Sequence, residues 1–165
     1  MPVPEYILGL RKQVGHDLLW LPGVNAVVLD DDGRVLLGER SDDGRWSLIA
    51  GFLEPGEQPA PGIVREVLEE TGVAVRVEGL AAVGSNDVTV YPNGDRAQYL
   101  TLTFLCRPES PEAAAALHVA DDESLAVGWF APDDLPENLG RNVRHHLALG
   151  LRLAADPAAG AWFAP

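Results

Sequence analysis

Apolar residues near the start of the chain recur with the spacing of a helix. Residues 4–14 are apolar at positions three or four apart, which predicts a short amphipathic helix. The next apolar run, residues 23–29, predicts a buried strand that ends in the acidic turn 30–33. Residues 34–40 are again rich in apolar side chains, and we expect them to pair antiparallel with the preceding strand.

The middle of the chain combines a loop and a second helical pattern. The apolar run 46–49 is followed by residues 50–59, which are rich in Gly and Pro and predict a loop. Residues 60–71 then show a helical pattern. Gly72 suits the position just after a helix end, where a left-handed backbone is needed.

The second half of the chain is richer in strand signals. Residues 73–83 are rich in β-forming side chains, and an Asn-Gly turn within residues 92–95 predicts a hairpin. The remaining expected elements are the hairpin strands 88–91 and 98–106, a surface excursion 109–116, a strand 125–130, a terminal helix 135–153 and a tail from 154 onward. The tail either packs through Trp162 and Phe163 or frays.

Strands and helices alternate irregularly, without a repeated strand–helix–strand unit. This order favours the α/β class, with a mixed β-sheet flanked by helices, over a parallel doubly wound sheet. No internal repeat or long linker divides the 165 residues, which is a common size for one domain. We expect an N-terminal helical extension at 1–20, a main domain at 21–153 and a C-terminal tail at 154–165.

The charge of the chain narrows the classes of ligand. Acidic residues number 25 and basic residues 12, which gives a formal net charge of −13 at pH 7. This surplus argues against nucleic acids and anionic lipids as partners, because both are bound by basic surfaces. A ligand that carries phosphate would need positive charge from something other than the average surface.

Cysteine content and hydropathy indicate the compartment. The single cysteine, Cys106, excludes an internal disulfide framework and is typical of a small core residue in a reducing compartment. No run approaches the roughly 20 apolar residues of a membrane span. The N-terminus also lacks the pattern of a signal peptide. We therefore expect a cytoplasmic protein that does not enter a membrane.

The helix predicted at 60–71 carries an unusual concentration of carboxylates. At 100° per residue, Ile63, Val64, Val67 and Leu68 share one arc, which we expect to pack on the sheet. Glu66, Glu69 and Glu70 fall on the opposite arc, and Glu57 in the preceding loop can join them. Carboxylates gathered in this way repel one another unless protons or cations neutralise them. Ligands that are all oxygen atoms suit Mg²⁺ or Mn²⁺ rather than zinc.

The spacing of these residues carries a family resemblance. Residues 51–73, GFLEPGEQPAPGIVREVLEETGV, resemble the Nudix box of the Nudix hydrolase family. A chance match somewhere in the chain has a probability on the order of one in a million. Every specified position of that pattern is filled, by Gly51, Glu57, Arg65, Glu66, Val67, Glu69, Glu70, Gly72 and Val73. The resemblance extends from about residue 21 to 153 and implies the α/β/α sandwich of that family, whose MutT-like members share this box.

The resemblance implies roles for individual residues. Glu66, Glu69 and Glu70 would be metal ligands, with Arg65 orienting a box glutamate and Glu57 supporting the site through metal-bound water or Arg65. The residue before the box glycine often donates its carbonyl to a metal, and here it is Ala50. Many relatives have glycine at that position, so a left-handed backbone would be less comfortable in this chain. Glu123, six residues before Trp129, matches a loop that supplies a further metal-binding or basic glutamate in several members.

The implied reaction is hydrolysis of a nucleoside diphosphate linked to another moiety. The substrate would be ADP-ribose or another nucleotide sugar, a dinucleoside polyphosphate, or a nucleoside triphosphate, oxidised forms included. The general base would be Glu66, Glu70 or Glu123, and the sequence does not choose among them. Arg40, Trp46, Tyr91 and Tyr99 are candidates to stack on a base or to bind phosphate, with ordinary packing as the alternative for each.

Two other functions are weighed against hydrolysis. A module that senses a nucleotide sugar without cleaving it would often lose box glutamates, and here all are present. An isoprenoid diphosphate isomerase would need a reactive cysteine in the cavity, a role for which Cys106 is poorly placed. The N-terminal helix and the Trp162-Phe163 tail are candidate contacts for a homodimer. His145 and His146 point about 100° apart on a helix and cannot share a metal; we expect both at the surface or an interface.

Overall fold

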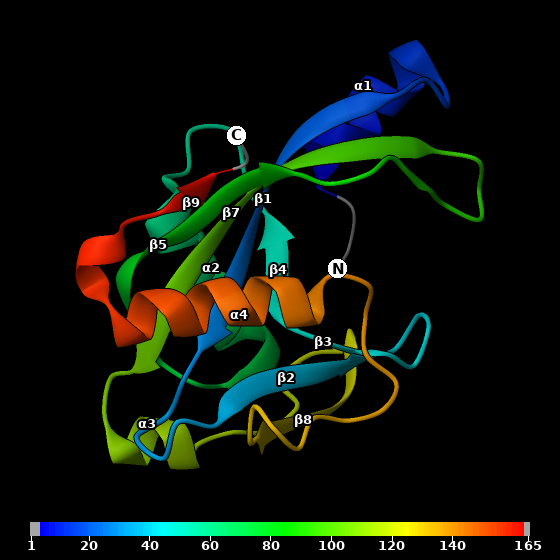
Figure 1. Cartoon of the computed structure of the whole chain (residues 1–165). Coiled ribbons are helices and arrows are strands. Elements are labelled where there is room, and N and C mark those ends of the chain that lie inside the picture. The colour runs from blue at the N-terminus through cyan, green and yellow to red at the C-terminus, as the bar shows by residue number, and fades with distance from the viewer. Residues whose placement is uncertain (1–3, 164–165) are drawn as a thin grey trace.

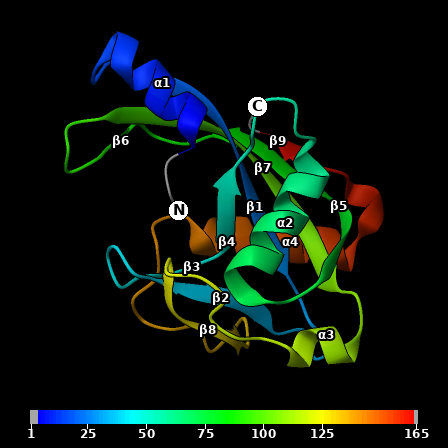
Figure 2. The same cartoon turned by 180° about the vertical axis from the view of Figure 1, so that it is seen from behind.

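The protein is a three-layer α/β/α sandwich, as the sequence predicts. The computed structural model describes residues 4–163. Figure 1 shows helix α4 (Val143–Ala155) in front of the central strands, and Figure 2, from behind, shows helix α2 (Pro59–Thr71) over the opposite face. Each helix buries one apolar face on the sheet, so the sheet is covered on both sides.

The central sheet is mixed, which confirms the expectation from the element order. Its strands follow the spatial order β4 (Ile49–Phe52), β1 (Leu19–Val28), β7 (Arg96–Pro108), β5 (Val75–Ser85) and β9 (Trp162–Phe163), with β6 (Thr89–Val90) paired to β7. Strands β1 and β7 run parallel over ten residue pairs, and so do β5 and β9 over two, whereas β4 pairs antiparallel with β1 and β5 antiparallel with β7. The predicted hairpin is present between β6 and β7, and Gly94 in its turn has a φ of 88°.

Strand β2 (Val35–Arg40) does not pair with β1 as the sequence analysis expected. It lies in a separate three-stranded sheet, between β3 (Trp46–Ser47) and β8 (Ser124–Phe130). Both edges of β1 are already taken by β4 and β7. The turn also redirects the chain, because the Asp30 carboxylate accepts hydrogen bonds from the backbone N–H groups of Asp32 and Arg34.

The start of the loop after residue 49 and the start of the last helix differ from those predicted from the sequence. The start of the expected loop, residues 50–52, belongs to strand β4 and pairs with β1. The last helix begins at Val143 rather than near 135. The preceding segment follows an irregular path because the backbone of Trp46 accepts from Gly140 N and donates to Asn138 O, each at 2.8 Å. The tail packs as β9 beside β5 instead of fraying.

The remaining helices lie at the periphery. Helix α1 (Glu5–Val14) confirms the predicted N-terminal helix, and α3 (Pro111–Ala115) and the 3-10 turn η1 (Pro157–Ala159) are short connecting elements. Figure 1 shows α1 beside the long arm formed by the first part of β1 and the hairpin. Within residues 4–163, no helix is long and apolar enough to cross a membrane.

One face of β1 positions the functional site. Alternate residues of a strand share a face, and on this face Leu21 packs with α1 while Val27 packs with α4. Helix α4 passes so close that a Cβ atom on Gly150 would lie 2.6 Å from Val27 Cγ1. Between these two contacts, Gly23 and Asn25 are left to line a cavity. The cavity therefore opens on this face of β1, with Ile7 of α1 in its lining.

Candidate active site

Gly51 on strand β4 and Glu66 on helix α2 are in direct contact. A Cβ atom at position 51 would overlap the carboxylate and Cγ of Glu66, so only glycine leaves room for this side chain. The Glu66 side chain is 6% exposed, in the interface between the helix and the sheet. The glycine that opens the motif thus allows a glutamate to lie against the strand.

Arg65 links three carboxylates of the motif. Its Nε and Nη2 atoms donate to the two oxygens of Glu57 at 2.9 and 3.1 Å. Its Nη1 donates to Glu69 Oε2 at 2.9 Å, and its Nη2 lies 3.0 Å from Glu66 Oε1. These contacts raise the pKa of Arg65, with the Glu57 hydrogen bonds as the largest cause, and the guanidinium lowers the pKa of Glu57. Arg65 therefore holds the loop and helix carboxylates in fixed positions.

The orientation of α2 differs in part from the predicted one. Ile63 and Val67 are fully buried as expected, but Leu68 is 48% exposed. Glu66 faces the sheet, and Glu69 points outward with a side chain that is 58% exposed. The buried residues of α2 span about 180° at 100° per residue, from Gly62 to Thr71. Glu70 falls inside this arc, close to Ile63, so the prediction that it lies opposite the apolar residues was wrong. The contact with Gly51 explains why a glutamate occupies this arc.

Glu66 and Glu70 have strongly shifted acidities. Burial raises the pKa of Glu66 to about 7, although Arg65 acts in the opposite direction. Burial, together with repulsion from Glu66, Glu123 and Asp121, raises the pKa of Glu70 to about 8. Such shifts mean that negative charge here is poorly compensated by the protein. A bound cation would compensate it.

The carboxylate oxygens of the motif are suitable ligands for a divalent metal ion. Within residues 4–163, no three His, Cys, Asp or Glu side chains converge closely enough to enclose a metal by themselves. The donors are nevertheless carboxylates whose charges repel one another, and Mg²⁺ usually keeps water and substrate oxygens as part of its shell. Ala50 lies in extended strand β4, opposite Asn25, and no non-glycine residue of the described chain has a positive φ. The alanine is therefore not strained.

A cavity of about 640 Å³ is lined by Glu70 and by Gly51, the residue that Glu66 contacts, but not by Glu66 itself. Its charged lining residues are Arg40, Asp42, Glu70, Asp95 and Glu123, which is one cation against four acids. The cation is already paired, since Arg40 Nε donates to Asp42 Oδ1 at 2.9 Å. An anionic ligand would be repelled from this lining unless positive ions entered with it.

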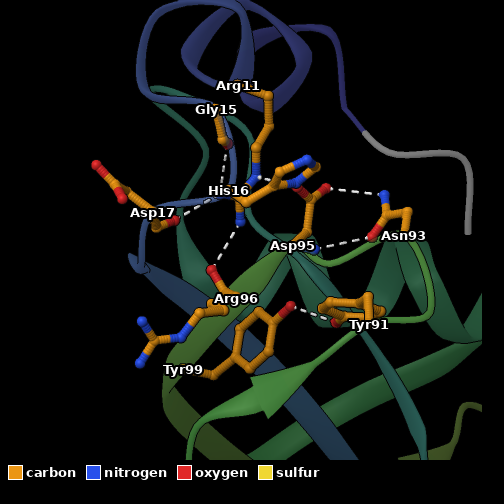
Figure 3. Close-up of polar contacts among 9 residues, drawn as sticks. All are labelled: Arg11, Gly15, His16, Asp17, Tyr91, Asn93, Asp95, Arg96 and Tyr99. Carbon is orange, nitrogen blue, oxygen red and sulfur yellow. Dashed lines mark hydrogen bonds and ion pairs between the residues drawn. The ribbon is translucent and has the colours of Figure 1, made fainter.

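Three of the four predicted substrate-binding residues line the cavity, and one does not. Arg40, Tyr91 and Tyr99 line the cavity, and the two tyrosine hydroxyls are hydrogen-bonded at 2.6 Å (Figure 3). Trp46 lies outside the lining and packs edge-on against Phe130, with ring centroids 4.8 Å apart. Glu123, from the loop before β8, does reach the cavity. The structure therefore brings Glu70, Glu123, Ala50 and three of the four substrate candidates to one place.

Other lining residues were not singled out from the sequence. Asn25, Asn86 and Asp95 line the cavity, and so does Ile7 of helix α1. Asn25 carries a visible signal, since it interrupts the apolar run GVNAVV, whereas the others reach the cavity only through the packing of distant segments. Asp95 also joins α1 to the hairpin, because His16 Nδ1 lies 2.8 Å from Asp95 Oδ1 (Figure 3).

The structure also places three residues that the sequence singled out and that lie outside the cavity. Cys106 is fully buried, as expected of a core residue, and burial raises its pKa to about 12. His145 is exposed, but His146 is buried and its Nδ1 lies 2.8 Å from Thr103 Oγ1, so the expectation of a surface position was wrong for His146. The amphipathic pattern of α4 places this histidine toward the sheet.

Comparison with known proteins agrees with the motif. A family profile described as NUDIX domain matches residues 19–149. The chain is 38% identical to a "MutT-like protein" of Streptomyces ambofaciens over 116 residues, which are 70% of this chain and 67% of that protein. It is 31% identical to the "8-oxo-dGDP phosphatase NUDT18" of Mus musculus over 90% of this chain, but spans only 42% of that longer protein. Among solved structures, an ADP-ribose pyrophosphatase from Streptococcus suis superposes with a TM-score of 0.68 at 26% identity, covering 87% of this chain and 98% of that one.

Proposed function

The chain belongs to the NUDIX family of hydrolases, and from this membership we propose that it cleaves a pyrophosphate bond with the help of Mg²⁺ or Mn²⁺. The substrate would be a nucleoside diphosphate linked to another moiety, and a nucleoside monophosphate or another phosphate compound would be released. The carrying observation is the pair Glu66 and Glu70, a buried and a half-buried glutamate with raised pKa values, of which Glu70 lines an acidic cavity.

The charge of the site supports a role for metal ions. A diphosphate would meet four acidic side chains and one paired arginine in this cavity. Divalent ions bound there would neutralise phosphate oxygens and lower the pKa of an attacking water. Glu66, Glu69, Glu70 and the Ala50 carbonyl are the proposed ligands. A binding mode without cations is disfavoured by the same repulsion.

The chain's own residues then have separate tasks. Arg65 holds Glu57, Glu66 and Glu69 at fixed distances, which keeps the proposed ligands oriented. Glu66, Glu70 and Glu123 are the candidates to accept the proton of the water. Arg40, which lines the cavity, is the proposed contact for a phosphate or sugar, and Tyr91 and Tyr99 are the proposed contacts for the base.

The substrate class is drawn from the relatives and from the size of the cavity. A volume of about 640 Å³ is that of a site for a small organic ligand. The names of the relatives direct attention to oxidised nucleoside di- and triphosphates and to ADP-ribose. Dinucleoside polyphosphates complete the set. The competing function, a sensor that binds a nucleotide sugar without cleaving it, is disfavoured because the motif glutamates are all present.

The cellular setting is proposed from the cysteine content of the chain. One fully buried cysteine is consistent with a reducing cytoplasm. The domain boundaries remain those proposed from the sequence, with residues 21–153 as the catalytic unit. A homodimer through α1 or the Trp162-Phe163 strand is compatible with the exposure of Leu8, Leu10 and Phe163.

A substrate panel tests the proposal directly. The purified protein is incubated with Mg²⁺ or Mn²⁺ and with ADP-ribose, other nucleotide sugars, dinucleoside polyphosphates, or normal and oxidised nucleoside triphosphates, and products are separated by chromatography. Glu66→Gln and Glu70→Gln should each lower turnover by about two orders of magnitude or more with the fold intact. Glu78→Gln is the matched control, because Glu78 pairs with Arg76 and Arg107 and is absent from the cavity lining. Absence of product from every compound would refute the hydrolase.

A further inference from the structure

Asn25 is a polar residue in the centre of the sheet. It lies on β1 between Ala50 of β4 and Thr103 of β7 in the strand register. Its neighbours Val24 and Ala26 are fully buried, while Asn25 itself is half-buried and lines the cavity. Asparagine is disfavoured in strands, so this position is not explained by local preference.

The amide of Asn25 is not used by the fold. Within residues 4–163, it makes no hydrogen bond to any other group. Two other asparagines line the same cavity, and the side-chain amides of both are hydrogen-bonded within the protein. Asn86 Nδ2 donates to Thr101 Oγ1 at 3.0 Å, and Asn93 Nδ2 donates to Asp95 Oδ2 at 3.0 Å. In the part of the chain that the structure describes, the buried side-chain polar atoms without a partner do not include the Asn25 amide, so it is open to the cavity, where a ligand can replace water as its hydrogen-bond partner.

A glycine and two aromatic rings lie beside Asn25 in the cavity lining. Gly23, two residues earlier on the same face, has no side chain, and a Cβ atom there would be in van der Waals contact with Tyr99 Cδ1 at 3.7 Å. Phe52 pairs with Gly23 in the sheet, and its ring centroid lies 5.6 Å from that of Tyr99. Two aromatic rings beside an open glycine and a free amide suit a planar heterocycle with polar edges.

We propose that Asn25 is a specificity-determining residue that reads the edge of the nucleobase. This inference rests on the proposed function, in which the phosphates lie near Glu70 and Glu123 of the same cavity. An amide offers an acceptor beside a donor, and it matches a base edge that presents a donor beside an acceptor, such as N6–H and N7 of adenine. A base edge with two acceptors satisfies only the amide N–H group and leaves its oxygen unpaired.

The experiment compares binding of AMP, GMP, CMP and UMP, in the presence of Mg²⁺, by calorimetry. The variants are Asn25→Val, which removes the amide and suits a strand, and Asn25→Asp, which keeps the shape but loses the donor. The control is Asn142→Ala, because Asn142 is exposed and makes no side-chain cap hydrogen bond. Wild type and control should prefer one base by about tenfold or more, and Asn25→Val should reduce that preference to within about threefold. Asn25→Asp should change the order of preference.

Thermal unfolding separates reading of the base from a structural role. Because the amide has no partner in the fold, Asn25→Val should keep or raise the Tm. A Tm that falls by more than about 4 °C would make Asn25 structural and overturn the inference. An unchanged base preference in Asn25→Val, equal affinity of the wild type for all four nucleotides, or no nucleotide binding would overturn it as well. A wild type that binds selectively but cleaves nothing in the substrate panel would refute the hydrolase while leaving the role of Asn25 intact.

Discussion

The carboxylate of Glu66 lies against the Cα atom of Gly51, at a position where a methyl group would collide with it. This contact joins the first residue of the motif to its central glutamate across the interface between β4 and α2. A buried carboxylate would ordinarily be excluded from such an interface. Its presence, with a pKa raised to about 7, indicates that the interface is built around the glutamate.

Substitution of Gly51 tests this contact. Gly51→Ala should displace Glu66 and lower turnover by about 100-fold, and overpacking should lower the free energy of unfolding by about 1–3 kcal/mol. Gly84→Ala is the control, since Gly84 also lies in a strand but its Cβ would be 4.0 Å from the Trp162 ring, at an ordinary van der Waals distance. Initial rates and chemical denaturation measure both effects. Equal rates in the two variants would show that the position of Glu66 is unimportant for turnover.

Arg65→Lys tests the guanidinium that joins three glutamates. Lysine keeps the charge but cannot donate two parallel hydrogen bonds to Glu57 while also reaching Glu66 and Glu69. We expect kcat to fall by about 10- to 100-fold, with a smaller change in KM. Arg76→Lys, which alters an arginine bonded to Pro108 and Glu78, should leave kcat within about twofold. Comparable losses in both variants would contradict the orienting role of Arg65.

Removal and addition of metal ions should change stability. If Glu66 and Glu70 hold a divalent ion, Mg²⁺ at about 100 times its Kd should raise the free energy of unfolding by about 2.7 kcal/mol. The double variant Glu66→Gln/Glu70→Gln should show no such increase. Without metal it should be at least as stable as the wild type, because two mutually repulsive carboxylates, one buried and one half-buried, are gone. Thermal unfolding with EDTA or with Mg²⁺ measures this, and an equal response in the two proteins would place the ion elsewhere.

His146 predicts a loss of stability in acid. Burial, and secondarily His145, lowers its pKa from 6.5 to about 4. Between these values the unfolded chain binds a proton that the folded protein does not, so stability rises with pH over this window. His146→Asn should lose less stability than the wild type between pH 6.5 and 4, with a difference on the order of a few kcal/mol.

The comparison with the variant is necessary because Glu66 and Glu70 titrate in part of the same range with the opposite sign. Their contribution is common to both proteins and cancels in the difference. Urea denaturation at several pH values gives the two curves. Parallel curves would mean that His146 does not remain neutral in the folded protein.

Asp95 is expected to hold helix α1 against the hairpin. It lies 2.8 Å from His16 Nδ1 and 3.5 Å from Arg11 Nε, and its backbone belongs to the turn that lines the cavity (Figure 3). Asp95→Asn should speed hydrogen exchange of the α1 amides by roughly tenfold, because local opening becomes easier. Asp32→Asn, which alters an exposed ion pair with Arg34, should not change exchange in α1. Mass spectrometry of peptides 5–14 provides the measurement.

Much of the architecture was predictable from local patterns. The N-terminal helix, the motif helix with Gly72 after its end, the hairpin at Asn93-Gly94 and the mixed sheet are all present. These features depend on residues close together in the chain, where helical periodicity and turn chemistry act directly. The prediction that β2 pairs with β1 was wrong, since strand pairing depends on which strand edges other segments already occupy.

The sequence by itself determined the identity of the motif, the family and the surplus of carboxylates, because these are properties of residue type and spacing. Only the tertiary structure decided that Glu66 is buried against Gly51, that Glu69 faces outward, and that Asn25 opens into a cavity lined by Glu70 and Glu123. The physical reason is that burial and partner choice are set by the packing of segments far apart in the chain. A helical wheel shows which residues share a face, but only the neighbouring strand shows which of them it can accommodate.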